Sequence, residues 1–184
     1  MVSWFNPILL IKLLLNVVIA DVFGQYADRR LIQAALDDET PKQRRERASL
    51  VDDLVPDSEG AVWFDFVADS GDGFDSTYAI AYLLAQPLLR VDGMKDPLPR
   101  GSALFMGGDE VYPTSKRQDY TDKFRTPYGW AMPNISGDKH HPPIFMIPGN
   151  HDWYDGLTNF LAMFCRNKQT SIGNWRTRQR RRHR

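Results

Sequence analysis

Three short apolar segments stand out along the chain, and each runs into a polar turn. They are AVWFDFVAD (61–69), GSALFMGGD (101–109) and IFMIPGNHD (144–152). Short apolar runs that are rich in β-branched and aromatic residues are typical of buried strands. Between and after them, STYAIAYLLAQ (76–86) and GLTNFLAMFCRN (156–167) carry apolar residues at helical spacing. Strands that alternate with helices or long connections predict βαβ units and a parallel sheet, hence an α/β fold.

The N-terminal region has a different pattern. ILLIKLLLNVVIA (8–20) predicts an apolar helix that begins near Pro7, because proline suits a first helical turn. The run is short for a membrane span. A signal peptide would have basic residues before its apolar run, and no lysine or arginine precedes this one. We therefore expect a helix that packs on the domain or lies at a membrane surface, through residues 4–23. A signal peptide or anchor is the alternative.

Two further segments read as polar. KQRRERASLVDDL (42–54), after Pro41, predicts a solvated helix, and SKRQDYTDKFRTPYG (115–129) predicts a polar surface helix or loop. Residues 1–58 then form an N-terminal helical extension, and residues 59–184 form the α/β domain. The aromatic residues of the first two strands, Trp63, Phe64, Phe66 and Phe105, are expected in the core.

The charges balance over the whole chain, with 23 basic and 23 acidic residues, but the last nine residues hold six arginines. The rest is therefore mildly acidic, and acidic groups that gather in one pocket need a cation. The arginine tail lacks interleaved aromatic residues, so we predict no specific nucleic acid partner. The single Cys165 excludes an internal disulfide, which fits a reducing compartment. We therefore expect a cytoplasmic protein that can associate with a membrane through the apolar helix; export is the alternative.

Polar side chains follow each of the three strands. Asp69 ends the first, Asp109 ends the second, and Asn150, His151 and Asp152 end the third. Parallel strands bring their carboxyl ends to one edge of the sheet, where ligands bind in α/β folds. Converging carboxylates repel one another unless a cation lies between them, so the pattern predicts a metal site.

Neighbouring residues have assignable roles in such a site. His151 carries a proton toward a substrate, and Asp152 is expected to hold its tautomer. Asp72 is a candidate extra metal ligand, while Asp75 fits a helix N-cap better. His140 and His141 precede the third strand and are expected in a solvated turn.

Together, DSG at Asp69, GDEVY at Gly108 to Tyr112 and GNHD at Gly149 to Asp152 resemble the calcineurin-like metallophosphoesterase superfamily. The pattern DxG…GDxxY…GNHD is most similar to its purple acid phosphatase variant. The resemblance implies a layered α/β/α sandwich that hydrolyses phosphate esters at a two-metal site with a bridging hydroxide.

The same resemblance implies roles for single residues. Asp69 would bind the first metal, Asp109 would bridge both, and Asn150 would bind the second metal and the substrate. His151 would contact phosphate and assist the leaving group, and Tyr112 would be a phenolate ligand of a ferric ion. The metals would be Mn, Fe or Zn.

Two later histidine motifs of that superfamily have no counterpart here. His140, His141 and His183 stand in other contexts. The chain is therefore expected to correspond to the amino-terminal half of such an enzyme, the first βαβαβ half, with weakened activity. The rival interpretation is a non-catalytic fragment that acts through its apolar N-terminal helix or its arginine-rich tail.

Overall fold

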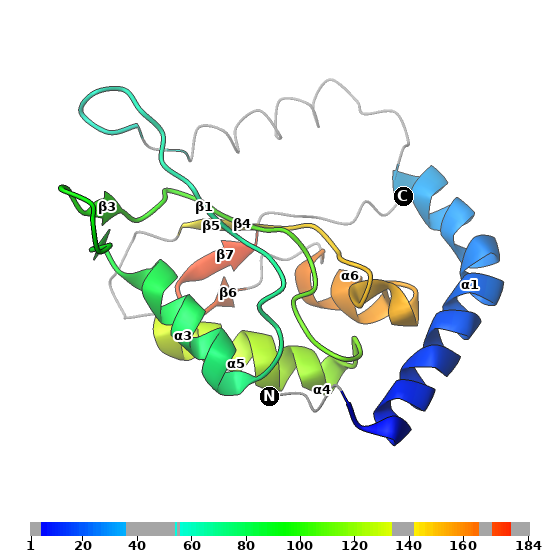
Figure 1. The fold of residues 1–184 in the computed structure, drawn as a ribbon. Helices are drawn as coiled ribbons and strands as arrows, with labels where there is room; N and C mark the ends of the chain where they lie inside the picture. Colours follow the sequence, from blue (N-terminus) through cyan, green and yellow to red (C-terminus); the bar gives the residue numbers. More distant parts are fainter. Residues whose placement is uncertain (1–4, 36–53, 55, 134–141, 166–170, 178–184) are drawn as a thin grey trace.

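The computed structural model describes residues 5–35, 54, 56–133, 142–165 and 171–177. Its main sheet runs in the order β1-β4-β5-β7-β6 (Figure 1). The strands are β1 (Asp65–Val67), β4 (Leu104–Met106), β5 (Pro143–Met146), β7 (Trp175–Thr177) and β6 (Ser171–Ile172). The first four run parallel, and β6 pairs antiparallel with β7. The mixed α/β class and the mostly parallel sheet expected from the sequence are confirmed.

The three predicted strands lie side by side in chain order. Their register aligns Val67 with Met106 and Met106 with Met146, so the three polar turns leave the sheet at the same edge. Leu104, Met106, Ile144 and Met146 alternate along β4 and β5 and are almost completely buried. Period-two burial of this kind is what a strand with one face toward a core requires.

The helices supply the other half of this core. They are α3 (Phe74–Ala85), α4 (Arg117–Tyr120), the π-helical turn η2 (Thr121–Arg125), α5 (Thr126–Ala131), the 3₁₀ turn η3 (Asp152–Asp155) and α6 (Thr158–Phe164). Figure 1 shows α3 and α5 next to each other, on the same side of the strands. Two strands of two residues, β2 (Leu88–Leu89) and β3 (Leu98–Pro99), form a separate antiparallel pair.

The segment 115–129, predicted as a polar surface helix or loop, is instead a core helix. Tyr120, Phe124 and Tyr128 are fully buried. Their spacing of four residues places them on one face of the helical run, while the charged residues occupy the other face. The abundance of charge in the sequence hid this aromatic stripe.

A second correction concerns the aromatic residues of β1 and its approach. Trp63, Phe64 and Phe66 are not in the core; Phe64 is 61% and Phe66 is 64% exposed. Phe66, Phe105 and Phe145 are aligned across three strands, and the last two stack with their ring centroids 5.0 Å apart. These rings belong to the sheet face opposite the described helices, and Ile147 is exposed just beyond β5. This face is apolar because the alternate residues of the three strands, which point to it, are apolar as well.

The C-terminal strands extend the sheet by a hairpin that the sequence analysis did not identify. Gly173 makes the turn with a φ of +56°, and an added Cβ there would collide with the carbonyl of Met132. Trp175 is buried, with its ring 5.6 Å from that of Tyr128. Most of the arginine tail, residues 178–184, lies outside the described residues.

The predicted N-terminal helix is present as α1 (Pro7–Ala35), and the helical character expected to continue past Ala20 is also observed. Asn6 caps it, since its side-chain oxygen accepts hydrogen bonds from the amides of Ile8 at 2.9 Å and Leu9 at 3.3 Å. Within the described residues, no helix is long and apolar enough to cross a membrane. The helix expected at 42–54 lies almost wholly outside those residues, so the division at residue 58 stays a prediction.

We predict that the exposed phenylalanine face makes the chain self-associate. Replacing Phe66 and Ile147 together by threonine should lower light scattering and leave the melting temperature nearly unchanged, because both side chains are mostly exposed. The matched control is Ile144→Thr on the buried face, which should destabilise the fold by about 2 kcal/mol or more. Unchanged scattering in the double variant would contradict the prediction.

Candidate functional site

Two aspartates at the carboxyl edge of the sheet have an unusual backbone. Asp69 follows β1 with a φ of +57°, and Asp109 follows β4 with a φ of +55°. This left-handed conformation is uncommon for a residue with a Cβ, although aspartate adopts it more readily than most residues do. Strain of this kind gathers at functional sites, and here it falls on two predicted metal ligands.

Glycines allow the turns to approach this closely. Gly108 has a φ of +109°, and an added Cβ would lie 2.6 Å from the amide nitrogen of Gly149. A Cβ on Gly149 would collide with the carboxylate of Asp109, and one on Gly71 would collide with the backbone of Glu110. The amide of Asp69 also donates to the carbonyl of Gly108 at 3.0 Å. The glycines of the motifs therefore serve close packing of one turn against the next.

The side chain of Asp152 connects the turn that follows β4 with the turn that follows β5. Its side chain is fully buried, and Oδ2 accepts hydrogen bonds from the amides of Asp109 and Gly149, each at 2.9 Å. Oδ1 accepts a hydrogen bond from the hydroxyl of Tyr120. Burial and then the Asp152 carboxylate raise the pKa of Tyr120 far above its ordinary value, so the phenol stays protonated and donates. Oδ2 of Asp152 thus holds the two turns together, and Oδ1 connects them to α4.

His151 is oriented by other groups than the expected Asp152. Its amide donates to Asp109 Oδ1 at 2.9 Å, and its ring Nδ1 lies 3.0 Å from the carbonyl oxygen of Pro113. The imidazole lies edge-on to the rings of Tyr112, at 4.6 Å, and Tyr154, at 4.8 Å. The side chain is therefore confined by the turn that follows Asp109 and by η3.

Three predicted ligands converge on one point. The hydroxyl of Tyr112 lies 3.0 Å from Asp69 Oδ1 and 3.1 Å from Asp109 Oδ2. A phenol has one proton, so it donates to only one of these carboxylates at a time. Burial, and then the two carboxylates, raise the pKa of Tyr112 well above its usual range. The two carboxylates therefore share a single hydrogen-bond donor.

The other predicted site residues lie around this cluster. Asn150 is in the third turn at the same sheet edge and is exposed. Asp72 is half-buried in the turn before α3. Asp75 lies in the first turn of α3, but the N-cap position is Gly73, so the expected cap is wrong. His140 and His141 lie outside the described residues.

Glu110 was missed by the sequence analysis. Its side chain is fully buried beside the carboxyl of Asp152, and neither of its oxygens makes a hydrogen bond of normal geometry with a described residue. Burial, and then Asp152, raise the pKa of Glu110 well above its ordinary value, which favours the neutral acid. The sequence signal that could have identified Glu110 is its position between Asp109 and the apolar Val111.

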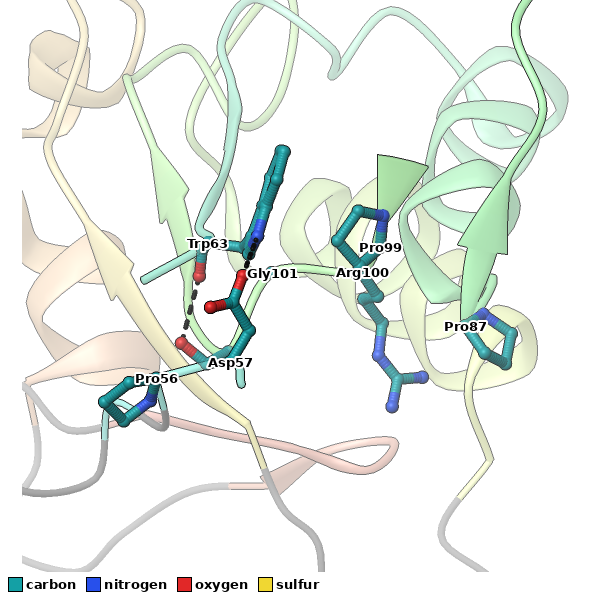
Figure 2. A pocket seen from close by; sticks show the side chains of 8 residues that line it. Pro56, Asp57, Trp63, Pro87, Pro99, Arg100 and Gly101 are labelled. Atoms are coloured by element: carbon teal, nitrogen blue, oxygen red, sulfur yellow. Dashed lines mark hydrogen bonds between the residues drawn. The ribbon is translucent and has the colours of Figure 1, made fainter. Parts of the chain in front are cut away.

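A cavity of about 270 Å³ lies elsewhere, at the amino-terminal approaches to β1 and β4 (Figure 2). Trp63, Arg100 and three prolines line it, and the indole of Trp63 donates to Asp57 Oδ2 at 2.9 Å. The strained aspartates lie at the opposite, carboxyl edge of these strands. We take that edge as the candidate functional site, because the predicted site residues Asp69, Asp109 and His151 lie there.

No family model matches the chain, and comparisons with curated proteins and with solved structures gave no match either. The donor atoms themselves then decide whether a metal fits. Among the described residues, no group of three or more His, Cys, Asp or Glu side chains could hold a metal ion. The Tyr112 hydroxyl does lie 3.0 Å from an Asp69 oxygen and 3.1 Å from an Asp109 oxygen, and oxygens are the donors that hard cations prefer. These three oxygens do not supply a full set for a second cation.

We therefore predict about one equivalent of bound manganese per chain, held by these three oxygens. Asp109→Asn should abolish binding, because it removes a negative charge while asparagine still tolerates the left-handed backbone. Asp92→Asn, which alters an exposed turn residue, is the matched control and should bind as the wild type. Metal analysis after dialysis gives the stoichiometry, and a wild-type chain without metal would contradict the assignment.

Proposed function

We propose that this chain hydrolyses phosphate esters with the help of metal ions at the carboxyl edge of its sheet. One observation carries the proposal: Asp69 and Asp109 both contact the hydroxyl of Tyr112. Both aspartates have a left-handed backbone conformation. The resemblance of the three turns to metallophosphoesterase motifs supports it, and the layered sandwich of that superfamily is part of the proposal.

The donor atoms bear on the choice of metal. All three converging ligands are oxygens, which favours Mn or Fe over Zn, since Zn is more often bound by nitrogen and sulfur. A bound cation would supply the positive charge that offsets the charge on the phosphoryl oxygens during hydrolysis. The second metal that the motifs imply would need ligands beyond the three convergent oxygens.

The protein side chains would orient and protonate the substrate. The amide of His151 holds Asp109 Oδ1, which leaves Asp109 Oδ2 directed toward Tyr112 and the cluster. Asn150 is exposed at the same edge, and its side-chain amide would donate to a phosphate oxygen. His151 would give a proton to the departing oxygen, so that a poor leaving group departs as an alcohol.

The test varies the leaving group. His151→Ala should lower the turnover of phenyl phosphate about 100-fold or more, the range that a general acid contributes. Nitrophenyl phosphate should suffer much less, because its leaving group is stable without a proton. Asp92→Asn should match the wild type on both substrates. Equal losses on both substrates would exclude the proton-donor role, and a wild type without activity on either would exclude the function.

Helix α1 supports a second candidate role, contact with a lipid surface. Apolar side chains are exposed around most of its first four turns, among them Ile8, Ile11, Leu14, Leu15 and Val18. The described contact of α1 with the rest of the chain is with η3. Exposed apolar surface on one segment marks a site of association with a membrane or a protein.

Leu14→Glu combined with Val18→Glu should abolish binding to phosphatidylcholine vesicles, because two charges would have to enter the acyl boundary. Lys12→Gln, on an exposed position of the same helix, should bind as the wild type does. Vesicle flotation measures the bound fraction. If the wild type does not bind the vesicles, the membrane role is wrong. That result would leave the phosphatase proposal untouched.

A further inference from the structure

The hydrogen bond of the His151 ring defines which nitrogen carries the proton. Nδ1 lies 3.0 Å from the carbonyl oxygen of Pro113, and a carbonyl can only accept. Nδ1 must therefore be the N–H in the neutral ring, which makes Nε2 the basic nitrogen. Nε2 is on the side of the ring away from Pro113.

The residues on both sides of Pro113 are bound to the helical run that follows them. Lys123, on the π-helical turn η2, donates a hydrogen bond to the carbonyl of Tyr112. The Thr114 hydroxyl donates to Asp119 Oδ2 at 3.2 Å, and Lys123 lies 3.5 Å from Asp119 Oδ1. The residues before and after Pro113 are thus tied to one another through the helix. Single-turn π-helices occur often at functional sites, and this one carries the lysine.

Two aromatic rings also lie against the imidazole. The ring of Tyr154 is 4.8 Å away at 62°, and that of Tyr112 is 4.6 Å away at 69°. Both angles are those of edge-to-face contacts, which limit rotation of the imidazole.

We propose that Lys123 and Tyr154 are positioning residues that hold His151 as the Nδ1–H tautomer, with Nε2 as the atom that exchanges a proton with the substrate. In the imidazolium, the Nε2–H bond would break and the proton would pass to the departing oxygen. The bonding electrons would stay on Nε2, and Nδ1–H would remain on Pro113. The transfer step rests on the proposed phosphatase function, whereas the tautomer can be measured without turnover.

Nitrogen-15 NMR of the imidazole rings tests the inference on the full chain. The chain has four histidines, so His151→Gln identifies the His151 signals. The spectra are recorded over a range of pH, and the tautomer is determined at the alkaline end, where the His151 signals no longer change. We expect the wild type to be mainly Nδ1–H. Lys123→Met should raise the Nε2–H fraction roughly fivefold, the ratio expected when one hydrogen bond is weakened.

Two matched pairs separate positioning from general damage. Lys116→Met changes an exposed lysine near the start of α4 and should leave the tautomer unchanged. Tyr154→Phe keeps the ring and should behave as the wild type, whereas Tyr154→Ala should raise the Nε2–H fraction. A wild type that is mainly Nε2–H would overturn the inference, as would unchanged spectra in both Lys123→Met and Tyr154→Ala. An inactive chain with the Nδ1–H tautomer would refute the phosphatase and support the positioning.

Discussion

The buried carboxylate of Asp152 is the interaction on which the site depends. It accepts two backbone amides from two different turns and a hydroxyl from the helical layer. A buried amide without a partner costs about 1–3 kcal/mol, so loss of this carboxylate would release both turns together. The left-handed backbone of Asp109 is held within this arrangement, and Asp109 in turn holds the amide of His151. The candidate site at the surface is therefore held in place by a side chain that is fully buried.

The sheet and the helices contribute unequally to this arrangement. Parallel pairing delivers the three turns to one edge, which is a property of strand order alone. The helical run adds what the strands cannot, since Tyr120 reaches Asp152 and Lys123 reaches the carbonyl of Tyr112. Positioning of the site thus comes from the covered face of the sheet, and the exposed phenylalanine face has no described part in it.

The sequence was sufficient for the parts of the structure that follow from local pattern. Apolar runs located β1, β4 and β5, and the rule for parallel sheets brought Asp69 and Asp109 to one edge. The sequence pattern was insufficient where contacts between residues far apart in the chain determine burial or side-chain direction. The buried stripe of Tyr120 was masked by neighbouring charges. The partner of His151 looked like the adjacent Asp152, although the ring lies against Pro113, because adjacency in sequence says little about side-chain direction. Phe66 looked like a core residue because the pattern gives no sign of which sheet face is covered.

The π-helical turn η2 has a consequence for insertions and deletions in this helix. It lies between Tyr120, which contacts Asp152, and Tyr128, which packs against Trp175. Removing one residue there would rotate the two tyrosines relative to each other by about 100°, the angle per residue of an α-helix. Only one of the two contacts could then survive. The number of residues between Tyr120 and Tyr128 is thus fixed by geometry, whereas the exposed turn around Asp92 and Gly93 has room for a change in length.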